Sequence, residues 1–413
     1  MGFEVTEIRA RRDRELFEAL RRDRGVEKAL ARYEEKASGY GFRHRRALLA
    51  ESIRLSRHMA PQVSAALADC RDALGFREPV EVFLRPEPVY GAFCARGRSG
   101  PLVVGLTARL LDEFSPEELR FVMGHELGHA LFRHHDLPMP ITATIEDIGG
   151  TLVSRAAQLK LYVWCRAAEV SADRAGLLCC RDADVAATAF FKLASGLARP
   201  SLQVDLQAFA SQIEAIASAP SATIREHDDD TLDCFSTHPY TPVRVRALLA
   251  FARSAVLARA LGRTGGDMEM EEVERVVEAD LALMEPSYLE ETTPESERLR
   301  RALYLGGVAV AQAHEGASPT ELHALRALLG ARAVAASSGT DARPGELEIV
   351  LAEVRGFPLA KRAQLVQHLT VIAGADGQVD DAEYEVMAGV ASALDVPQEV
   401  IDQTLRAAAA PMD

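Results

Sequence analysis

The sequence has no CxxC motif and few aromatic residues. The first absence bears on the state of its cysteines, and the second bears on its fold class. Its six cysteines are dispersed along 413 residues, apart from the adjacent Cys179 and Cys180. A chain of this length buries enough apolar surface to fold without disulfides, so we expect reduced thiols and a cytoplasmic protein. Aromatic residues make up only 6% of the chain, while alanine and leucine are abundant, which predicts a mainly helical fold.

The sequence also lacks an uninterrupted apolar run of membrane-spanning length. The best candidate, residues 141–165, is broken by the charged residues Glu146, Asp147, Arg155 and Lys160. The N-terminal stretch carries charges throughout and has no apolar signal-peptide region. We therefore expect no transmembrane segment. The net charge of -14 argues against a nucleic acid as the main partner.

Composition divides the first part of the chain into three segments. Residues 1–60 have 15 basic and 10 acidic side chains and predict a charged helical arm, for which a solvated face is the simplest interpretation. Residues 61–255 contain β-branched, glycine-punctuated stretches at 79–107, which predict two or three short strands, and become helical from Ser115 onward. Residues 256–294 are acidic and predict a linker that carries one helix.

Residues 295–413 predict a separate all-α domain with two similar halves. A favourable N-cap and first helical residue, Thr293-Pro294, precedes it. Residues 308–330 and 369–394 each contain an apolar helix, a glycine loop, a capping box and a second apolar helix. The two capping boxes are Ser318 with Glu321 and Asp380 with Glu383.

The stretch FVMGHELGHALFRHH, residues 121–135, is the part of the sequence that indicates chemistry. A capping box that begins at Ser115 predicts a helix running through it. At about 3.6 residues per turn, His125 and His129 share one face, so both imidazoles can bind one metal ion. Glu126 lies beside them and can reach a metal-bound water, which is the H-E-x-x-H arrangement with glutamate as the general base.

The remaining histidines of this stretch, His134 and His135, are poorer candidates for metal ligands. Continued helical spacing would turn them away from the face of His125 and His129. Near a helix end a cationic histidine is instead favoured by the helix dipole. The alternative for the motif itself, two exposed histidines on a surface helix, conflicts with the apolar residues that flank it.

A catalytic zinc site needs a third protein ligand from another part of the chain. The stretch AAEVSADRAGLL, residues 167–178, offers Glu169 and Asp173, one helical turn apart on one face. We expect Glu169 to ligate zinc through a carboxylate oxygen and Asp173 to accept the outer N–H of a ligating histidine. Two acids on a helix are common by themselves, and the histidine motif is what favours ligation.

Together these residues give the chain a resemblance to the HtpX/CAAX-prenyl-protease family of zinc endopeptidases, within the gluzincin group. The similar pieces are GAFC (91–94), the stretch 103–134, EVSADRAG (169–176) and STHPYTPVRVRAL (236–248), in that order. The resemblance implies an α+β, mostly α, zincin-type peptidase domain with a small edge sheet and an H-E-x-x-H helix.

The resemblance also implies a role for each matching residue of the metal site. His125, His129 and Glu169 would bind one zinc ion per chain. Glu126 would be the general base, and Asp173 would support a ligating histidine. These roles agree with the chemistry expected from the spacing of the residues.

Further residues are implied to bind the substrate and the transition state. His238 and Arg244 would line the site and stabilise the oxyanion, although a loop histidine and a surface arginine are the simpler alternatives. Gly91, Ala92 and Phe93 would belong to an edge strand along which a peptide substrate lies. Many members have asparagine where this chain has Gly91, which affects one side-chain contact to the substrate.

The C-terminal region resembles the TerB-like tellurite-resistance domain. Residues 374–387, GADGQVDDAEYEVM, carry the resemblance, and residues 313–322 look like a degenerate first copy. The acidic residues lack the spacing of a calcium-binding loop. The resemblance implies a docking or regulatory role with a protein partner.

The sequence therefore predicts a soluble zinc metalloendopeptidase acting on proteins or peptides, with a TerB-like domain for docking or regulation. Membrane members of the family process prenylated proteins or work within the bilayer, and the lack of spans argues against such processing here. Two alternatives remain. One is a catalytically silent zinc-binding scaffold that acts through its TerB-like domain. The other is a latent protease gated by residues 1–60 or by the acidic stretch 226–230.

Overall fold

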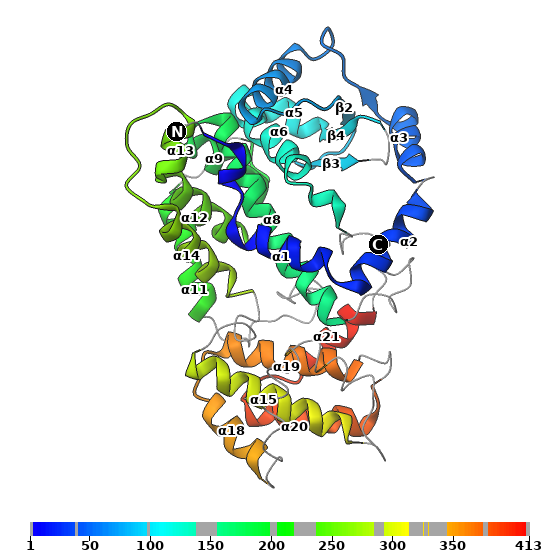
Figure 1. Cartoon of the computed structure of the whole chain (residues 1–413), viewed down its shortest axis with the longest axis vertical. Coiled ribbons are helices and arrows are strands. Elements are labelled where there is room, and N and C mark those ends of the chain that lie inside the picture. The colour runs from blue at the N-terminus through cyan, green and yellow to red at the C-terminus, as the bar shows by residue number, and fades with distance from the viewer. Residues whose placement is uncertain are drawn as a thin grey trace. The chain divides into compact units, whose positions relative to one another are not determined.

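The computed structural model of the chain (Figure 1) describes residues 3–37, 40–96, 100–137, 155–198, 205–218, 237–284, 293–313, 325, 329, 345–374 and 379–409. The chain folds into two compact units. The first consists of Met1–Met139, Trp164–Ile213 and His238–Leu281. The second consists of Pro140–Val163, Glu214–Thr237 and Ala282–Asp413.

The first unit begins with a run of helices. Their bounds are η1 (Val5–Ile8), α1 (Arg11–Arg21), α2 (Arg24–Ala37), α3 (Tyr40–Glu51) and α4 (Pro61–Leu74). Helix α1 is amphipathic, and its inner face buries Leu16, Phe17 and Leu20. The sequence predicted a solvated outer face for this region. Arg11 of α1 instead forms ion pairs with Glu271 and Glu278, at 2.8 Å each. The start of the chain is thus packed into the unit.

A four-stranded sheet lies beside these helices. It consists of β1 (Ile53–Arg54), β2 (Val80–Arg85), β3 (Ala92–Arg96) and β4 (Leu102–Thr107), in the order β1-β2-β4-β3. Strand β4 is parallel to β2 and antiparallel to β3, and β1 pairs antiparallel with β2. Three of these strands fall in the predicted segment 79–107, whereas β1 lies where the sequence indicated helix.

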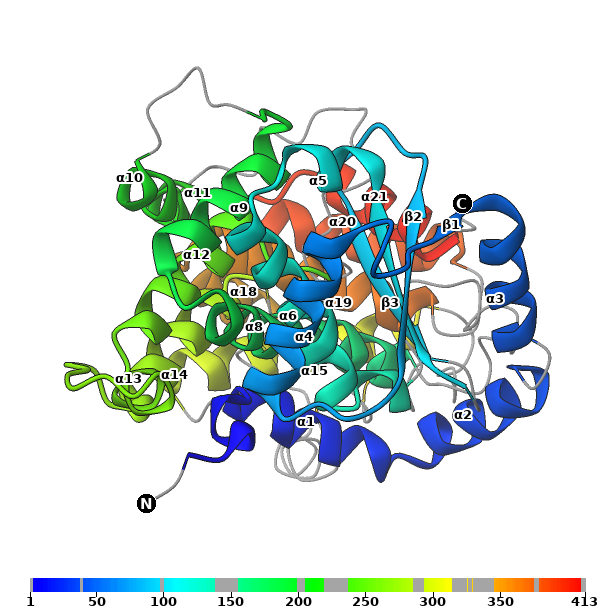
Figure 2. The same cartoon turned by 90° about the horizontal axis from the view of Figure 1, so that it is seen from above.

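The two faces of the sheet are covered by different helices (Figure 2). Figure 2 shows α3 on one side of the strands and α4 and α6 (Pro116–Leu131) on the other. All six residues of β4 are buried, as expected for a central strand covered on both faces. On the α3 side the Phe93 ring lies over Gly105, where an added Cβ would come within 2.0 Å of the ring. A larger residue at position 105 would require the Phe93 ring to move.

Helices complete the first unit. They are α5 (Ala108–Glu113), α6, η2 (His134–Asp136), α9 (Ala183–Ser195), α10 (Leu206–Ala210), α12 (Thr241–Ala252), α13 (Ala255–Ala260) and α14 (Met270–Leu281). Helix α8 (Arg155–Cys180) belongs to this unit from Trp164 onward, and α11 (Gln212–Ser218) belongs to it as far as Ile213. The predicted acidic linker contains α13 and α14, and both belong to the first unit. Two acids of α14 are buried because they pair with arginines: Glu274 with Arg174 and Asp280 with Arg246.

The second unit contains α15 (Pro294–Ala311), α18 (Glu346–Val354), α19 (Leu359–Ala373), α20 (Asp381–Ala393) and α21 (Glu399–Ala409). The predicted helix starts are confirmed: Thr293 caps α15, and Asp380 and Glu383 form the capping box of α20. The first predicted box, Ser318 with Glu321, lies outside the described residues. Buried aliphatic side chains from these helices form one core.

The expected fold class is confirmed: the chain is mostly α, with one small sheet and an all-α C-terminal region. Among the described helices, none has the length and apolar character needed to cross a membrane. Every cysteine within the described residues carries a free thiol.

Candidate active site

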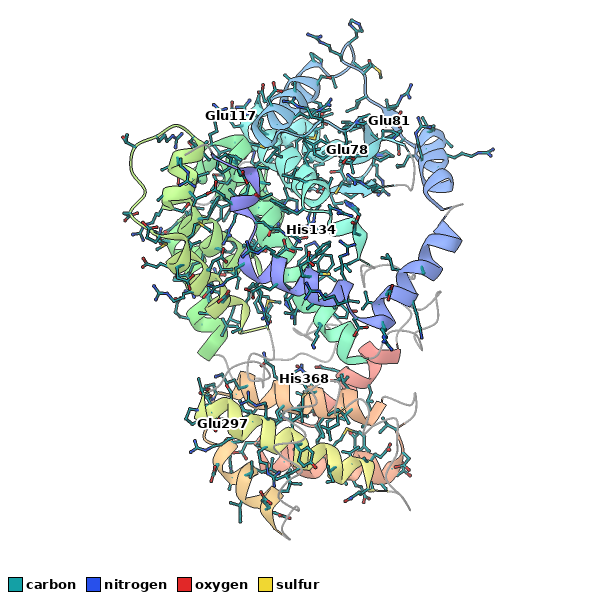
Figure 3. All side chains as sticks on the ribbon, in the orientation of Figure 1. Glu78, Glu81, Glu117, His134, Glu297 and His368 are labelled. Atoms are coloured by element: carbon teal, nitrogen blue, oxygen red, sulfur yellow. The ribbon has the colours of Figure 1, made fainter. Side chains whose placement is uncertain are left out.

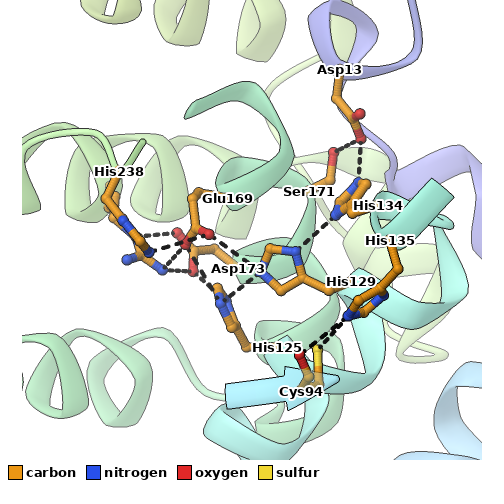
Figure 4. A network of polar contacts seen from close by, with 11 residues as sticks. Asp13, Cys94, His125, His129, His134, His135, Glu169, Ser171, Asp173 and His238 are labelled. Atoms are coloured by element: carbon orange, nitrogen blue, oxygen red, sulfur yellow. Dashed lines mark hydrogen bonds and ion pairs between the residues drawn. The ribbon is translucent and has the colours of Figure 1, made fainter. Parts of the chain in front are cut away.

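The two histidines of the predicted motif lie on α6 and point at one another. Ser115 accepts a hydrogen bond from the Glu118 N–H, and the Glu118 carboxylate accepts one from the Ser115 N–H, so the capping box is confirmed. One turn apart on this helix, His125 and His129 bring their Nε2 atoms to 3.1 Å (Figure 4). Both side chains are largely buried, so the Nδ1 atom of each ring needs a hydrogen-bond partner within the protein.

The third predicted ligand, Glu169, comes from α8. Its Oε1 lies 3.3 Å from His129 Nε2, and its Oε2 lies 3.5 Å from His125 Nε2. Among the described residues, His125, His129 and Glu169 form a cluster whose donor atoms could hold a metal ion. Ligands at about 2.0–2.2 Å in a tetrahedron lie roughly 3.3 Å apart, so these three donors fit a zinc ion.

Glycines allow α6 and α8 to approach closely enough for this convergence. A Cβ atom added to Gly128 would lie 2.8 Å from the Ala175 Cβ and 3.2 Å from the Ala172 Cα. At Gly124 it would lie 2.7 Å from the Cys179 side chain. Gly128 therefore allows the backbone of α8 to approach α6 closely.

Charge around Glu169 keeps it ionised. Burial by itself would raise the pKa of Glu169, but the neighbouring charges of His238 and Arg244 hold it well below its ordinary value. Burial likewise acts to lower the pKa of His125, yet the hydrogen bond to Asp173 and the charge of Glu169 raise it above its ordinary value. A cluster of this kind attracts a cation.

Asp173 lies where the sequence placed it, on the outer side of a ligating histidine. Its Oδ1 is 2.9 Å from His125 Nδ1. The ring must therefore carry its proton on Nδ1, which leaves the Nε2 lone pair facing the cluster. Arg244, on α12, donates to both carboxylate oxygens of Asp173, and its Nη2 is also 3.1 Å from Glu169 Oε2.

Glu126 is buried beside the cluster, on the side of strand β3. Its charge, after burial itself, raises the pKa of the Cys94 thiol. Its charge also acts to raise the pKa of His125, its neighbour in the chain. Glu126 is not one of the three residues whose donor atoms converge.

His238 lies in the turn before α12, with its Nε2 3.5 Å from Glu169 Oε1. Its side chain is 54% exposed, in contrast to the buried ligands. A partly exposed imidazole at the rim can reach a molecule that enters the site.

The predicted substrate strand is β3 with the preceding Gly91, and it forms one edge of the sheet within the described strands. The Gly91 carbonyl accepts a hydrogen bond from the Thr107 N–H at 3.0 Å. Because bonded and non-bonded pairs alternate in an antiparallel ladder, Phe93 also bonds inward to β4, whereas Ala92 and Cys94 direct their backbone groups outward. Of the three predicted residues, Ala92 presents its backbone to the outer edge.

Two histidines that the sequence set aside lie beside the site. Helix α6 ends at Leu131, and Arg133 adopts a left-handed backbone with φ of 63°. This reversal carries His134 back to His129, with their Nδ1 atoms 2.9 Å apart (Figure 4). His135 instead contacts the Cys94 carbonyl at 3.2 Å. Helical spacing could not reveal these contacts because the helix has already ended.

Two histidines one turn apart, a glutamate from a second helix and another glutamate next to the first histidine are the set of side chains that metal-dependent hydrolases use. The small sheet with an exposed edge is suited to binding an extended chain. Fold and site together thus define a metallopeptidase-type domain.

Comparison with known proteins finds two family models that match separate regions of the chain. Residues 57–252 match Peptidase family M48, and residues 300–406 match Tellurite resistance protein TerB. One curated relative is Plastoglobule-localized metallopeptidase 48, chloroplastic, of Arabidopsis thaliana, which is 26% identical over 230 residues. The match covers 54% of this chain and 66% of that protein. No solved structure matches the chain. A region similar to Peptidase family M48 is thus followed by a region similar to TerB, in the order that the two resemblances implied.

Proposed function

We propose that the chain is a zinc-dependent endopeptidase that hydrolyses peptide bonds in protein substrates. The observation that carries the proposal is the convergence of His125, His129 and Glu169, with their donor atoms within 4.8 Å of one another. A site that only braced the fold would need no buried Glu126 beside this cluster.

The three ligands would hold one zinc ion, and Glu126 would move the protons. A bound zinc ion supplies Lewis-acid chemistry, which activates water and polarises the scissile carbonyl. Glu126 accepts the proton of the attacking water and later delivers it to the leaving amine. Its burial keeps this carboxylate away from bulk solvent and next to the reacting groups.

His238 and Arg244 would stabilise the negative charge that develops on the carbonyl oxygen. The half-exposed imidazole of His238 can donate a hydrogen bond to a substrate at the rim. Arg244 has its guanidinium engaged by Asp173 and Glu169, so it would act through its charge and by orienting both carboxylates.

The substrate would add to the outer edge of β3 as an extended strand. Ala92 offers an N–H and a carbonyl in that direction, as the alternation of the ladder requires. The Phe93 side chain lies on the α3 side of the sheet over Gly105, so it would support the strand instead of touching the substrate.

The TerB domain would dock or regulate, and the protein would work in the cytoplasm. The proposed location is supported by the free thiols Cys70, Cys94, Cys165, Cys179 and Cys180, which a reducing compartment preserves. A docking role is supported by the all-α second unit, in which the described residues form no second metal cluster.

The test is Glu126→Gln in the full chain, compared with Glu117→Gln on the same helix. Glu117 is exposed and pairs with Arg120, away from the cluster. Glu126→Gln should bind zinc as the parent does and lose about 10²–10⁴-fold in peptide hydrolysis. Glu117→Gln should match the parent in both respects.

Terminal-peptide proteomics in the native cell supplies the substrates for this comparison. New protein N-termini should be present with the parent and absent with Glu126→Gln. Parental turnover by Glu126→Gln, or identical sets of termini in both strains, would contradict the proposal.

A further inference from the structure

A chain of polar contacts runs from the metal site to the beginning of the protein. His129 Nδ1 lies 2.9 Å from His134 Nδ1, and His134 Nε2 lies 3.0 Å from Asp13 Oδ2 (Figure 4). Asp13 is on α1 and precedes His134 by 121 residues. All three side chains are buried, so no bulk water replaces these contacts.

The protons of this chain can be assigned from geometry. Two nitrogens 2.9 Å apart need one proton between them, so one Nδ1 donates and the other accepts. If His129 binds metal through Nε2, its proton is on Nδ1, and His134 Nδ1 is the acceptor. The His134 proton is then on Nε2, where it donates to the Asp13 carboxylate. Only this arrangement satisfies every atom of the chain.

Asp13 is firmly held in the position that this assignment requires. Arg9 donates two hydrogen bonds to it, at 2.8 and 2.9 Å, and Trp164 Nε1 donates one at 3.0 Å. Ser171 Oγ donates another at 2.7 Å and itself accepts from the Ala10 N–H. The carboxylate is completely buried yet fully hydrogen-bonded, so its negative charge can face His134 without rearrangement.

We propose that Asp13 is a positioning residue for the metal ligand His129 and acts through His134. The proposal rests on the zinc site of the proposed function and adds to it a part of the chain outside the matched peptidase region. Each ligating histidine then has its own acid: Asp173 orients His125 directly, and Asp13 orients His129 through one intervening imidazole. A buried acceptor behind a ligating histidine fixes its tautomer and strengthens metal binding.

The experiment measures zinc affinity of the full chain by competition with a chromophoric chelator, a readout that does not depend on turnover. Asp13→Ala and His134→Ala should each raise the zinc dissociation constant about 10–100-fold. Because both changes break one chain of contacts, the double variant should bind zinc about as weakly as either single variant. Asp13→Asn keeps an acceptor for His134 and should recover part of the loss.

Asp280→Ala is the matched control, because it also removes a buried acid paired with an arginine. Asp280 lies on α14 and binds Arg246, with no contact to a ligating histidine. It should lower the temperature of unfolding but leave zinc affinity unchanged. This comparison separates positioning of His129 from a general loss of stability.

Three results would overturn the inference. The first is that Asp13→Ala and His134→Ala both bind zinc as tightly as the parent. The second is that the losses of zinc affinity in the two single variants add up in the double variant. The third is that Asp280→Ala loses as much zinc affinity as Asp13→Ala. If the parent itself bound no zinc, the proposed function would fail together with the inference. If the parent bound zinc and cleaved peptides while Asp13→Ala matched it, only the inference would fail.

Discussion

The guanidinium of Arg244 binds the carboxylate of Asp173 through two parallel hydrogen bonds. Arg244 Nη2 lies 2.6 Å from Asp173 Oδ1, and Nε lies 2.9 Å from Oδ2. The same Oδ1 accepts the proton of His125. Two bonds from a planar group prevent the carboxylate from rotating, so Arg244 fixes the acceptor that orients a metal ligand.

Arg244→Lys should therefore weaken the site although it keeps the positive charge. A lysine ammonium cannot form the two-bond contact, which leaves Asp173 free to turn. We expect zinc affinity to fall about 10–100-fold, as when a partner behind a ligating histidine is lost. Arg246→Lys, two residues along α12, is the control, because Arg246 makes the same kind of contact with Asp280. Equal zinc affinity in both variants would contradict the role given to Arg244.

Because α6 packs closely against α8, we expect a substitution at Gly128 to disturb both stability and zinc binding. Gly128→Ala would place a methyl group 2.8 Å from the Ala175 Cβ and must push α8, with Glu169, away from the histidines. We expect a loss of about 1–3 kcal/mol in the free energy of unfolding, together with weaker zinc binding. Thermal unfolding and chelator competition measure the two effects.

Gly389→Ala on α20 provides the contrast for this change. An added Cβ there meets no atom within 4 Å. It should stabilise the helix by about 0.5–1 kcal/mol, because alanine is the better helix former. A Gly128→Ala protein that gained stability in the same way would show that the two helices are not tightly packed.

Ala92→Pro tests whether substrate pairs with the edge strand. The N–H of Ala92 points away from β4, so its loss removes a bond to substrate and none to the sheet. We expect kcat/KM for peptide hydrolysis to fall about tenfold, the effect of losing one hydrogen bond of about 1.5 kcal/mol. Zinc affinity should remain parental.

Phe93→Pro should behave differently, because the Phe93 N–H bonds inward to β4. It should lower the temperature of unfolding, whereas Ala92→Pro should leave it nearly unchanged. If Ala92→Pro kept the parental kcat/KM, pairing of substrate with this edge would be excluded.

His368 makes the stability of the second unit depend on pH (Figure 3). The side chain is completely buried on α19, and burial lowers its pKa to about 3. The unfolded chain has a histidine pKa of about 6.5 and so binds the extra proton first as the pH falls. The unfolded state holds more protons between these values, and stability must therefore decrease from about pH 6.5 downward.

His368→Leu should remove this contribution. Below pH 6.5 the parent should lose stability relative to the variant as the pH falls. The difference between their free energies of unfolding should change by up to about 1.4 kcal/mol per pH unit. Calorimetric unfolding of both full-length proteins across this range measures the difference. A difference that stayed constant with pH would show that the pKa of His368 is the same in the folded and unfolded states.

The sequence alone determined the features that depend on local spacing. The capping box at Ser115 started α6 where predicted, and the four-residue step from His125 to His129 placed both rings on one face. The same step on α8 set Glu169 beside Asp173. Helical geometry repeats within a few residues, so residue identity and number are enough to predict such pairs.

Tertiary structure decided which other residues surround the site residues of α6 and α8. His134 reaches His129 only because α6 ends at Leu131 and the backbone reverses at Arg133. Asp13 reaches His134 because α1 buries its apolar face in the unit, and α14 brings Glu274 to Arg174 in the same way. The contacts of Asp13 with His134 and of Glu274 with Arg174 join residues a hundred or more positions apart, and no sequence period relates them. Burial of apolar faces selects the packing, and the packing then decides which buried charges meet.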